Sequence, residues 1–394
     1  MKNKICSIII VGYNSAPDLE ACLKSIFAQT LSSTLLSSLT AKENVSKKVS
    51  AKSYEVILVD NASIDNTEQV AAQFMQKHGR AMRYIPLKKN IGFAAGNNVG
   101  AVETSTDYLI FVNPDTIVHA GWLDALLLPL VQDERVGMTT SRILHAGEPH
   151  LLNACGNDIT WTGITVCRGL NEPADSRNET EQVSAVSGAS FAMRAELFQQ
   201  LNGFDERFFM YFEDTDLSNR VRMLGYQILY TPDSILRHKY IFKFSKQKLY
   251  YQERNRWLSL LKILRVRTLI ILMPGLLIGE LMAWAYAAMH GLDHLRAKAT
   301  GWRWIWHHRA EIMQQREAVY ALRQTHQLEL TERTATPHTS GYTLDHMSDK
   351  ALIRHWSPNL RFVGTMPYLP AKLLEQSVRP LLQGYGTICR LLTA

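Results

Sequence analysis

A cluster of four carboxylates lies among aromatic residues in the stretch from 203 to 220. The acids are Asp205, Glu213, Asp214 and Asp216, and the aromatic residues are Phe208, Phe209, Tyr211 and Phe212. Aromatic neighbours desolvate a carboxylate and raise its pKa toward useful basicity. We therefore predict that Asp214, with Glu213 beside it, is a general base. The alternative is that both acids only cap a helix, because acids in a first turn favour the positive end of the helix dipole.

Asp115 is a second acid with a chemical interpretation. It follows a predicted strand in the sequence Val112-Asn113-Pro114-Asp115-Thr116, in which Pro114 stiffens the turn. Mg2+ prefers one or two carboxylates together with phosphate oxygens, so we predict a divalent cation shared with a diphosphate at this position. An ordinary turn aspartate is the alternative. His238 has no neighbouring ligand in sequence, and a lone histidine is more often structural than a metal ligand.

Polar residues also gather where other predicted strands end. We expect Asp60 to accept a hydrogen bond from a pyrimidine or a ribose, unless it only caps a turn together with Ser63 and Asp65. The run from 90 to 100 is rich in Gly and Asn, which lets backbone approach a ligand and offers amides to a base or sugar. The candidate ligand-binding residues are Tyr13, Asn14, Asp60, Asn61, Ser63, Asn90, Gly92, Asn97, Asn98 and Asn113.

These residues need a sheet that brings strand ends to one edge. Apolar, β-branched runs predict buried strands at 5–11, 54–59, 82–86 and 108–112. Helical spacing predicts a helix at 17–29 whose inward residues are Leu19, Cys22, Leu23 and Ile26. Alternating strands and helices favour βαβ units, so the predicted fold class is α/β with a mostly parallel sheet flanked by helices. Ligands bind beyond the carboxyl ends of the strands in such sheets.

The remaining elements are less regular. Residues 31–53, rich in Ser, Thr and Lys, are expected to form a polar insertion and a mobile loop. Further strands are expected at 136–140, 186–193 and 226–230, and a hairpin or irregular segment at 152–169. A helix is expected to begin at the acidic cluster and to bury Leu217, Val221 and Leu224.

Composition limits the class of protein. The chain has 394 residues, of which 46% are apolar and 20% charged, which predicts one large globular domain with an appendage, or two domains. The five cysteines include no CxxC pair, so free buried thiols in a reducing cytosol are expected, with a Cys155–Cys167 bridge as the alternative. The apolar run at 5–11 is too short for a signal peptide core with its cleavage site.

The net charge of +7 belongs to the C-terminal part of the chain. The first 258 residues contain 27 basic and 27 acidic residues, whereas residues 259–394 contain 16 and 9. A neutral body with a basic, apolar tail favours an anionic membrane surface as a partner. We expect no nucleic-acid partner, because the sequence has no aromatic-and-basic nucleic-acid motif.

The apolar stretch at 268–290 is long enough to span a bilayer. Glu280 and the pair Pro274-Gly275 make a simple span costly. Basic residues flank both ends, so we expect a re-entrant or surface-lying helical hairpin with both ends in the cytoplasm, anchored by the tryptophans of 301–309. A buried core helix is the alternative. Beyond Glu329 the sequence predicts loops and a short helix at 370–382.

Eight motifs in this order resemble the inverting, nucleotide-sugar-dependent glycosyltransferase family 2, and most closely its bacterial rhamnosyltransferase-like members. They are SIIIVGYN (7–14), ILVDNASIDNT (57–67), NIGFAAGNNVG (90–100), FVNPDT (111–116), VSGASFAMR (186–194), GFDERFFMYFEDTDLSNR (203–220), His238 and YYQERNRW (250–257). The resemblance covers about residues 5–257. It implies a GT-A fold, a Rossmann-like sheet in which nucleotide and acceptor halves are fused, followed here by a C-terminal helical membrane-associated region.

The resemblance also implies roles for single positions. Asp115 would be the surviving acid of the family's D-x-D motif, whose first acid is Asn113 here, so that the site carries less negative charge. His238 would join Asp115 in holding the metal or diphosphate, with Mg2+ or Mn2+ as the cofactor. Asp214 matches the acid that serves as base in the family's E-D pair.

The same comparison places Asp60 at the base or ribose and Asn97 or Asn98 at the nucleotide. Arg254, with Asn255 beside it, falls near the family's Q-x-x-R-W region and joins the donor-binding candidates. That region reads Gln252 to Trp257 here, with one extra residue. The departure argues against a processive synthase and for one sugar per encounter.

The function implied is transfer of a single sugar from a dTDP- or UDP-sugar, with rhamnose from dTDP-rhamnose as the best guess, onto a lipid-linked or glycan acceptor. The chain would be bacterial, at the cytoplasmic face of the plasma membrane, with 1–258 as transferase domain, 259–330 as membrane-associating region and 331–394 as extension. The oligomeric state is not predicted. Alternatives are a UDP-hexose or UDP-galactofuranose donor, or a non-catalytic scaffold that binds glycan or membrane. A nucleotidyltransferase is disfavoured, because Gly12-Tyr13-Asn14 is no Gly-rich loop with Arg or Lys.

Overall fold

The chain forms two units, each assembled from three separate segments. A computed structural model describes residues 4–42, 53–239, 245–334, 348–359 and 368–393. The first unit comprises residues 1–157, 167–217 and 227–240, and the second comprises residues 158–166, 218–226 and 241–394. The chain therefore passes from the first unit to the second and back twice, at residues 158–166 and 218–226, before it ends in the second unit.

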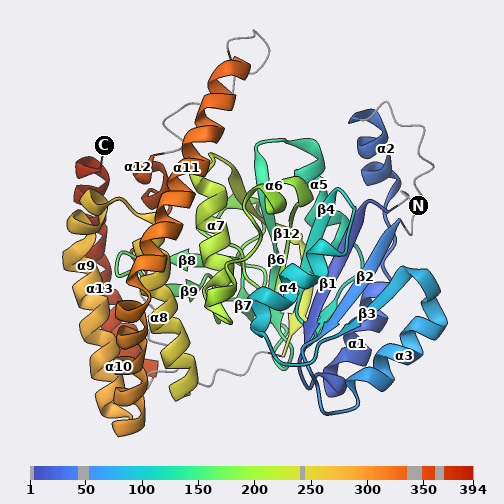
Figure 1. Cartoon of the computed structure of the whole chain (residues 1–394), viewed down its shortest axis with the longest axis horizontal. Helices are drawn as coiled ribbons and strands as arrows, with labels where there is room; N and C mark the ends of the chain where they lie inside the picture. The colour runs from blue at the N-terminus through green and yellow to red at the C-terminus, as the bar shows by residue number, and fades with distance from the viewer. Residues whose placement is uncertain (1–3, 43–52, 240–244, 335–347, 360–367, 394) are drawn as a thin grey trace. The chain divides into compact units, whose positions relative to one another are not determined.

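The first unit is built on a ten-stranded sheet in the order β10-β12-β6-β11-β4-β1-β2-β3, with β5 paired to β12 and β7 to β6 (Figure 1). The bounds are β1 Cys6–Gly12, β2 Tyr54–Asp60, β3 Met82–Pro86, β4 Tyr108–Val112, β5 Thr116–Val118, β6 Val136–His145, β7 Leu152–Ala154, β10 Glu181–Gln182, β11 Ser190–Arg194 and β12 Gln227–His238. A separate pair joins β8 Asn157–Ile159 to β9 Thr165–Cys167.

Helices cover this sheet and frame its strand ends. They are α1 Ala16–Phe27, α2 Ser33–Lys42, α3 Thr67–His78, α4 Gly92–Val102, α5 Trp122–Gln132, α6 Ala195–Gln200 and α7 Glu213–Met223, with short 3-10 turns η1 Gly79–Ala81 and η2 Glu206–Phe208. The second unit contains α8 Lys246–Ile263, α9 Val266–Met289, α10 Leu292–His307, α11 Arg309–Thr334, α12 Asp349–Ile353 and α13 Tyr368–Leu392.

Strand direction in the sheet is mixed. β1 pairs in parallel with β2 and β4, β2 with β3, and β6 with β12, whereas β11 lies antiparallel between β4 and β6. The register sets Gly12 beside Asp60, so the loops that follow β1 and β2 leave the sheet at the same edge. The α/β fold and the first four strands are as predicted. The antiparallel placement of β11 between β4 and β6 was not predicted.

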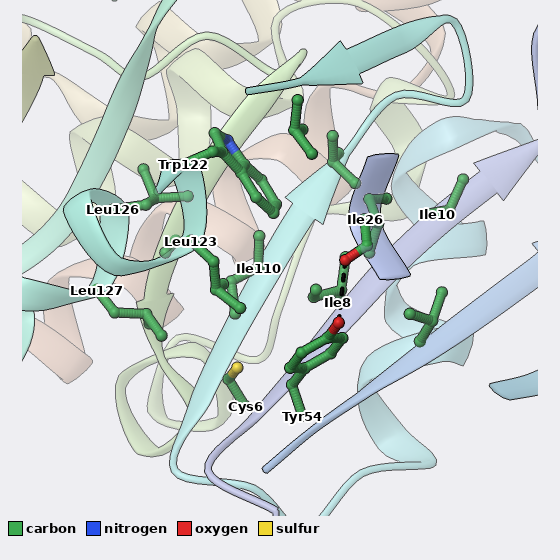
Figure 2. Packing of buried hydrophobic residues seen from close by; sticks show 14 of the residues in the cluster. Cys6, Ile8, Ile10, Ile26, Tyr54, Ile110, Trp122, Leu123, Leu126 and Leu127 are labelled. Atoms are coloured by element: carbon green, nitrogen blue, oxygen red, sulfur yellow. Dashed lines mark hydrogen bonds between the residues drawn. The ribbon is translucent and has the colours of Figure 1, made fainter. Parts of the chain in front are cut away.

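β1 lies at the centre of the core and is buried along its whole length. Figure 2 shows Ile8 and Ile10 packed among Ile26 of α1, Ile110 of β4 and Trp122 of α5. Burial of one such side chain contributes about 1.5–3 kcal/mol relative to its exposure. The Tyr54 hydroxyl donates a hydrogen bond of 3.0 Å to the Ile26 carbonyl, which ties α1 to β2. The four predicted inward residues of α1 are all buried.

The predicted mobile loop at 31–53 is wrong for its first part. Residues 33–42 form α2, because Leu35 is buried in the core and Leu36 and Leu39 pack against it. Ser32 caps this helix by accepting a hydrogen bond from the Leu35 amide. The apolar residues at helical spacing therefore prevail over the polar composition. Residues 43–52 of the predicted loop lie outside the described part of the chain.

In the second unit, residues 266–289 form one continuous helix rather than a hairpin. By length and apolar composition, α9 is the one helix among the described residues that could cross a membrane. Its central acid is not exposed to lipid: Glu280 accepts hydrogen bonds from Trp257 (2.8 Å), Trp302 and Arg256 (2.7 Å), and forms an ion pair with Lys298. The predicted short helix at 370–382 is part of the longer α13.

Candidate active site

The structure brings Asp115 and His238 together. Asp115 lies in the turn between β4 and β5, and His238 ends β12, which pairs with β5 so that His238 stands beside Thr116. The His238 Nε2 lies 3.3 Å from Asp115 Oδ1. The Lys239 amide also donates a hydrogen bond of 3.0 Å to the Asp115 carbonyl, which fixes the two loops against each other. The two residues predicted as metal ligands are therefore neighbours.

The chemistry of this pair fits a divalent cation. Nδ1 of His238 is hydrogen bonded at 3.0 Å to Oδ1 of the buried Asn153. A side-chain partner on one ring nitrogen fixes the orientation of a metal-binding histidine and leaves the other nitrogen, here Nε2 on the Asp115 side, as the candidate ligand. Two ligands of one six-coordinate Mg2+ or Mn2+, each about 2.1 Å from the ion, lie roughly 3 Å apart. Among the described residues no third His, Cys, Asp or Glu joins them.

The carboxylate of Asp214 is held by four hydrogen-bond donors. Its Oδ2 accepts from the Gly188 amide (2.8 Å) and from Asn157 Nδ2 (3.1 Å). Its Oδ1 accepts from the amide (2.6 Å) and the hydroxyl (3.2 Å) of Thr215. Gly188 leaves room for this contact, since a Cβ atom there would lie 3.3 Å from Oδ2. The predicted helix does begin at the acidic cluster, with Glu213, Asp214 and Asp216 in its first turn.

Burial acts on both acids of the predicted catalytic pair. Desolvation raises the pKa of Asp214, while the donors from Gly188 and Thr215 oppose that rise. Desolvation raises the pKa of Glu213 well above its usual range, and the adjacent Asp214 charge raises it further. The Glu213 side chain is buried, and its Oε2 has no hydrogen-bond partner among the residues that the structure describes. Such a pair holds a proton at a pH where exposed carboxylates have lost theirs.

One turn connects the base to the metal pair. The Asn113 amide donates to the Ala189 carbonyl at 3.1 Å, and the neighbouring Gly188 amide donates to Asp214. Asn113 is two residues from Asp115 in the turn after β4. Of the two consecutive residues that precede β11, Gly188 therefore contacts Asp214 and Ala189 contacts the turn that carries Asp115. The predicted base, the predicted metal ligands and the loop after β4 therefore lie at one edge of the first unit.

A strained loop fixes the start of α7. Phe209, Tyr211 and Phe212 have φ values of 60°, 67° and 72°, a left-handed conformation that side chains disfavour. The Phe209 carbonyl accepts hydrogen bonds from the Phe93 (2.6 Å) and Ala94 (3.2 Å) amides at the N-terminus of α4. This contact stabilises the strained backbone and links α4 to the loop that carries Asp214.

The loops after β1 and β2 are bound to each other. The Asn14 amide donates to Ser63 Oγ (2.8 Å), and the Ile64 amide donates to Asn14 Oδ1 (2.9 Å). Asp60 accepts from the Ser63 amide (2.9 Å) and from the Tyr84 hydroxyl (2.6 Å), as its turn interpretation expects. Tyr13 is half exposed beside them. Side chains of these residues form one polar rim.

The other donor-binding candidates have structural partners. Asn61 bridges the Gly92 carbonyl and the Ile91 amide, and Asn90 accepts from the Gly92 amide. Asn97 is buried and donates to the Phe93 carbonyl. Asn98 binds both backbone groups of Phe204 and Glu206 Oε1. These amides shape the start of α4 and its contact with the 203–206 turn.

Arg254 belongs to the second unit. Its guanidinium lies over the rings of Tyr250, Tyr251 and Trp304 at 5.4, 5.0 and 4.6 Å from their centroids, and its Nε donates to Asn255. Of the tryptophans expected at a membrane interface, Trp302 donates to Glu280 and Trp304 lies under the Arg254 guanidinium, while Trp302 and Trp306 are exposed.

Sequence reasoning missed Asn153, Asn157 and Tyr84, which hold His238, Asp214 and Asp60 respectively. Each lies far from its partner in sequence, so no local pattern marks it. Gly188 could have been found, because it lies in the small-residue run at 186–190, and small residues allow another part of the chain to approach closely.

The chain matches one family model and several curated relatives. A family model described as "Glycosyl transferase family 2" matches residues 7–201. The N-acetylglucosaminyl-diphospho-decaprenol L-rhamnosyltransferase of Mycobacterium tuberculosis is 27% identical over 264 residues, 60% of this chain and 76% of that protein. Rhamnosyltransferase WbbL of Escherichia coli K12 is 24% identical over 49% of this chain and 76% of its own length.

Solved structures share the fold at low sequence identity. The UDP-GlcNAc complex of S. aureus TarS 1-349 has a TM-score of 0.51 and 14% identity over 81% of this chain and 83% of that one. GalNAc-T7 with UDP, GalNAc and Mn2+ has a TM-score of 0.51 and 17% identity over 66% of this chain, which spans about half (48%) of that protein. The chain belongs to glycosyl transferase family 2, is a glycosyltransferase, and is similar to the rhamnosyltransferases of that family.

Proposed function

We propose that the chain transfers a single sugar, with rhamnose from dTDP-rhamnose as the first candidate, from a nucleotide-sugar to a lipid-linked or polysaccharide acceptor with inversion. The observation that carries this proposal is the turn at Gly188 and Ala189, which touches both Asp214 and the loop of Asp115. Support for the donor comes from the names of the two rhamnosyltransferase relatives. The mycobacterial name also supports a lipid-linked diphosphate acceptor.

Asp214 is the base in this mechanism. The acceptor hydroxyl gives its proton to the Asp214 carboxylate as its oxygen attacks the anomeric carbon. The new bond joins that oxygen to the sugar, and the bond from the sugar to the nucleoside diphosphate breaks with its electron pair on the diphosphate. Attack opposite to the leaving group inverts the anomeric centre.

Asp115 Oδ1 and His238 Nε2 would hold the cation. A bound Mg2+ or Mn2+ supplies charge stabilisation for the leaving diphosphate. Asn153 keeps the His238 ring in the orientation that presents Nε2. This pair contains only one carboxylate, because Asn113 stands where the family has an acid. It would therefore bind the ion weakly until the diphosphate contributes its oxygens.

The polar rim formed by Tyr13, Asn14, Asp60 and Ser63 is the proposed site for the nucleoside. Parallel strands of this kind bind nucleotides beyond their carboxyl ends, and β1 and β2 end in register there. Arg254 is proposed to complete the donor site. We also propose that residues 1–258 contain the transferase part and that the basic, apolar remainder holds the chain at the cytoplasmic face of a bacterial plasma membrane.

The alternative within the family is a UDP-hexose or UDP-galactofuranose donor. TarS, which shares the fold, was solved with UDP-GlcNAc, so a uridine diphosphate sugar is retained as the alternative donor. The alternative outside enzymes is a scaffold that binds glycan or membrane without catalysis. Two adjacent acids with raised pKa values favour catalysis over the scaffold.

The substitution Asp214→Asn tests the base, with Asp65→Asn as a matched change at a turn carboxylate of the same unit. Transfer by Asp214→Asn should fall by about 100-fold or more, because general-base catalysis contributes that much. Donor binding, measured by thermal shift with dTDP- and UDP-sugars and Mn2+, should be unchanged. Full transfer by the variant would refute the assigned base. The same screen, repeated with EDTA and with His238→Ala, should show loss of the cation-dependent shift.

A further inference from the structure

Helix α9 leaves a row of large apolar side chains in solvent. The row consists of Val266, Ile270, Met273, Leu277 and Leu281, whose exposed fractions are 62%, 65%, 37%, 52% and 70%. Their spacing of three or four residues places them on one face of the helix. The opposite face, which includes Leu272, Leu276, Gly279 and Ala283, is buried in the second unit. A contiguous exposed apolar face of this kind marks an interaction site.

Helix α13 packs beside α9 and carries exposed apolar side chains of its own. The Tyr385 hydroxyl donates to the Ile271 carbonyl (3.0 Å) and accepts from the Gly275 amide (3.2 Å), and Arg267 donates to the Leu392 carbonyl (3.2 Å). The two helices are therefore antiparallel neighbours (Figure 1). The exposed apolar residues of α13 are Leu381, Ile388, Leu391 and Leu392. We call these four residues and the α9 row the α9–α13 surface.

The contacts of Glu280 keep α9 attached to the protein. Its carboxylate binds Arg256 of α8 and Lys298 of α10, both of which are 1% exposed. If α9 left to cross a bilayer alone, these two buried cations would lose a carboxylate partner, and an acid would enter hydrocarbon. The structure therefore favours a helix α9 that stays packed against the second unit on one side and exposes only its other side to a partner.

Charge identifies the partner of the α9–α13 surface. Arg265 and Arg267 are exposed at the start of α9, and Arg379 is exposed on α13. The acids in the sequences of these two helices are Glu280, which is paired, and Glu375. An apolar row with exposed arginines beside it, as at the start of α9, matches the interface of an anionic bilayer, where apolar side chains enter the acyl region and cations meet headgroups.

We propose that the α9–α13 surface binds an anionic lipid bilayer, with α9 lying in the plane of the interface instead of crossing it. This inference deepens the membrane association proposed above. Its test requires neither sugar donor nor acceptor, so its failure would leave the proposed transfer chemistry standing.

The experiment uses the full chain and sedimentation with vesicles of phosphatidylcholine alone or with 30% phosphatidylglycerol, a composition chosen for the test. The protein should bind the anionic vesicles preferentially. The variant Ile270→Glu/Leu277→Glu/Leu281→Glu should lose at least about tenfold in binding, because it places three acids where apolar side chains meet lipid. Leu328→Glu, an exposed leucine on α11 of the same unit, is the matched control and should bind like the parent chain. Circular dichroism verifies that the variants are folded.

A second measurement distinguishes an α9 helix that lies in the membrane interface from one that spans the bilayer. Cysteines replacing Arg265 and His290, at the two ends of α9, should both react with a membrane-impermeant maleimide added outside the vesicles. Protection of either end would show a span and overturn the proposal. Unchanged binding of the triple variant would also overturn it. So would a lipid-free dimer of the parent chain that the triple variant abolishes, because the occupant would then be a second copy.

Discussion

The Asp214 carboxylate experiences two opposing influences. Burial raises its pKa, whereas hydrogen bonds from Gly188 and Thr215 stabilise the charged form and limit the rise. A general base is most effective when its pKa is close to the working pH, so neither influence alone would serve. Asn157, which adds a side-chain donor to Oδ2, is therefore positioned to influence the pKa of the proposed base.

The substitution Asn157→Leu should move the acid limb of the kcat/KM profile to higher pH. The Nδ2 donor favours the ionised carboxylate, so its loss raises the pKa of Asp214. Thr215→Val, which removes the hydroxyl donor to Oδ1, should shift the limb in the same direction. Glu213, whose pKa is raised by burial and by the Asp214 and Asp216 charges, remains unchanged in both variants, as does Asp216. The profile of Thr104→Val, a hydroxyl that only binds the Ala101 carbonyl, should match the parent. A fall in rate without a shift would assign Asn157 a purely structural role.

Ionisation of the buried Glu213 should destabilise the folded protein above acidic pH. Its pKa is raised in the folded state by burial and by Asp214, so between the unfolded value, about 4.3, and the folded value the native state binds more protons. Stability therefore decreases as pH rises through that window. In Glu213→Gln the decline of Tm from pH 5 to pH 8 should be shallower than in the parent, and Tm at pH 8 higher. The exposed Glu196→Gln is the control, and equal slopes for all three proteins would contradict this assignment.

At the scale of elements, the start of α4 and the 209–212 loop depend on one glycine. Gly92 has a φ of 90°, and a Cβ atom there would lie 2.5 Å from the Phe209 carbonyl oxygen. That oxygen also accepts the two amides that begin α4. A side chain at residue 92 would therefore displace the loop that precedes Asp214.

Gly92→Ala should lower the free energy of unfolding by about 3 kcal/mol, from about 1 kcal/mol of left-handed strain and roughly 2 of overpacking. Gly79→Ala is the control, because Gly79 also has a positive φ of 55° but no atom within 4 Å of its Cβ position; it should cost about 1 kcal/mol. Urea denaturation measures both. Transfer should also fall more in Gly92→Ala than its stability accounts for. Equal losses in the two variants would show that the Phe209 contact is unimportant.

Elements defined by local sequence were predictable, and those defined by distant partners were not. Strands β1 to β4 and helix α1 follow from apolar runs and helical spacing. The parallel pairing of β6 with β12, by contrast, joins segments about 90 residues apart, and no periodicity records it. α2 was missed because its polar residues outnumber the three leucines that hold it. At the proposed site, motifs single out Asp115, His238 and Asp214. No motif marks Asn153 or Asn157, which meet His238 and Asp214 only in the folded chain.

At the scale of the whole molecule, the sequence boundary expected at 258 does not coincide with the units. Residues 158–166 and 218–226 belong to the second unit, together with everything after 240. Trp161, at the tip of the β8–β9 hairpin, packs on Trp356 and Tyr385 at 5.9 and 6.4 Å between ring centroids. Gly275 and Gly386 also contact Trp161 closely, and neither position could accept a Cβ atom without a shift. Four neighbours of one tryptophan thus come from the last third of the chain.

A chain cut after residue 258 should therefore fail to behave as an autonomous domain. It retains Trp161 but loses these four neighbours, and an exposed cluster of this kind promotes association. We expect soluble aggregates in size-exclusion chromatography and a red-shifted emission that Trp161→Phe and Trp257→Phe together remove, because Trp257 also loses its partners Glu280 and Trp302. Trp122, fully buried in the first unit, keeps its blue emission. In the full chain, Trp161→Ala should cost about 3–5 kcal/mol. A monomeric cut chain with the parent's circular dichroism and Tm would instead show that the hairpin folds without the second unit.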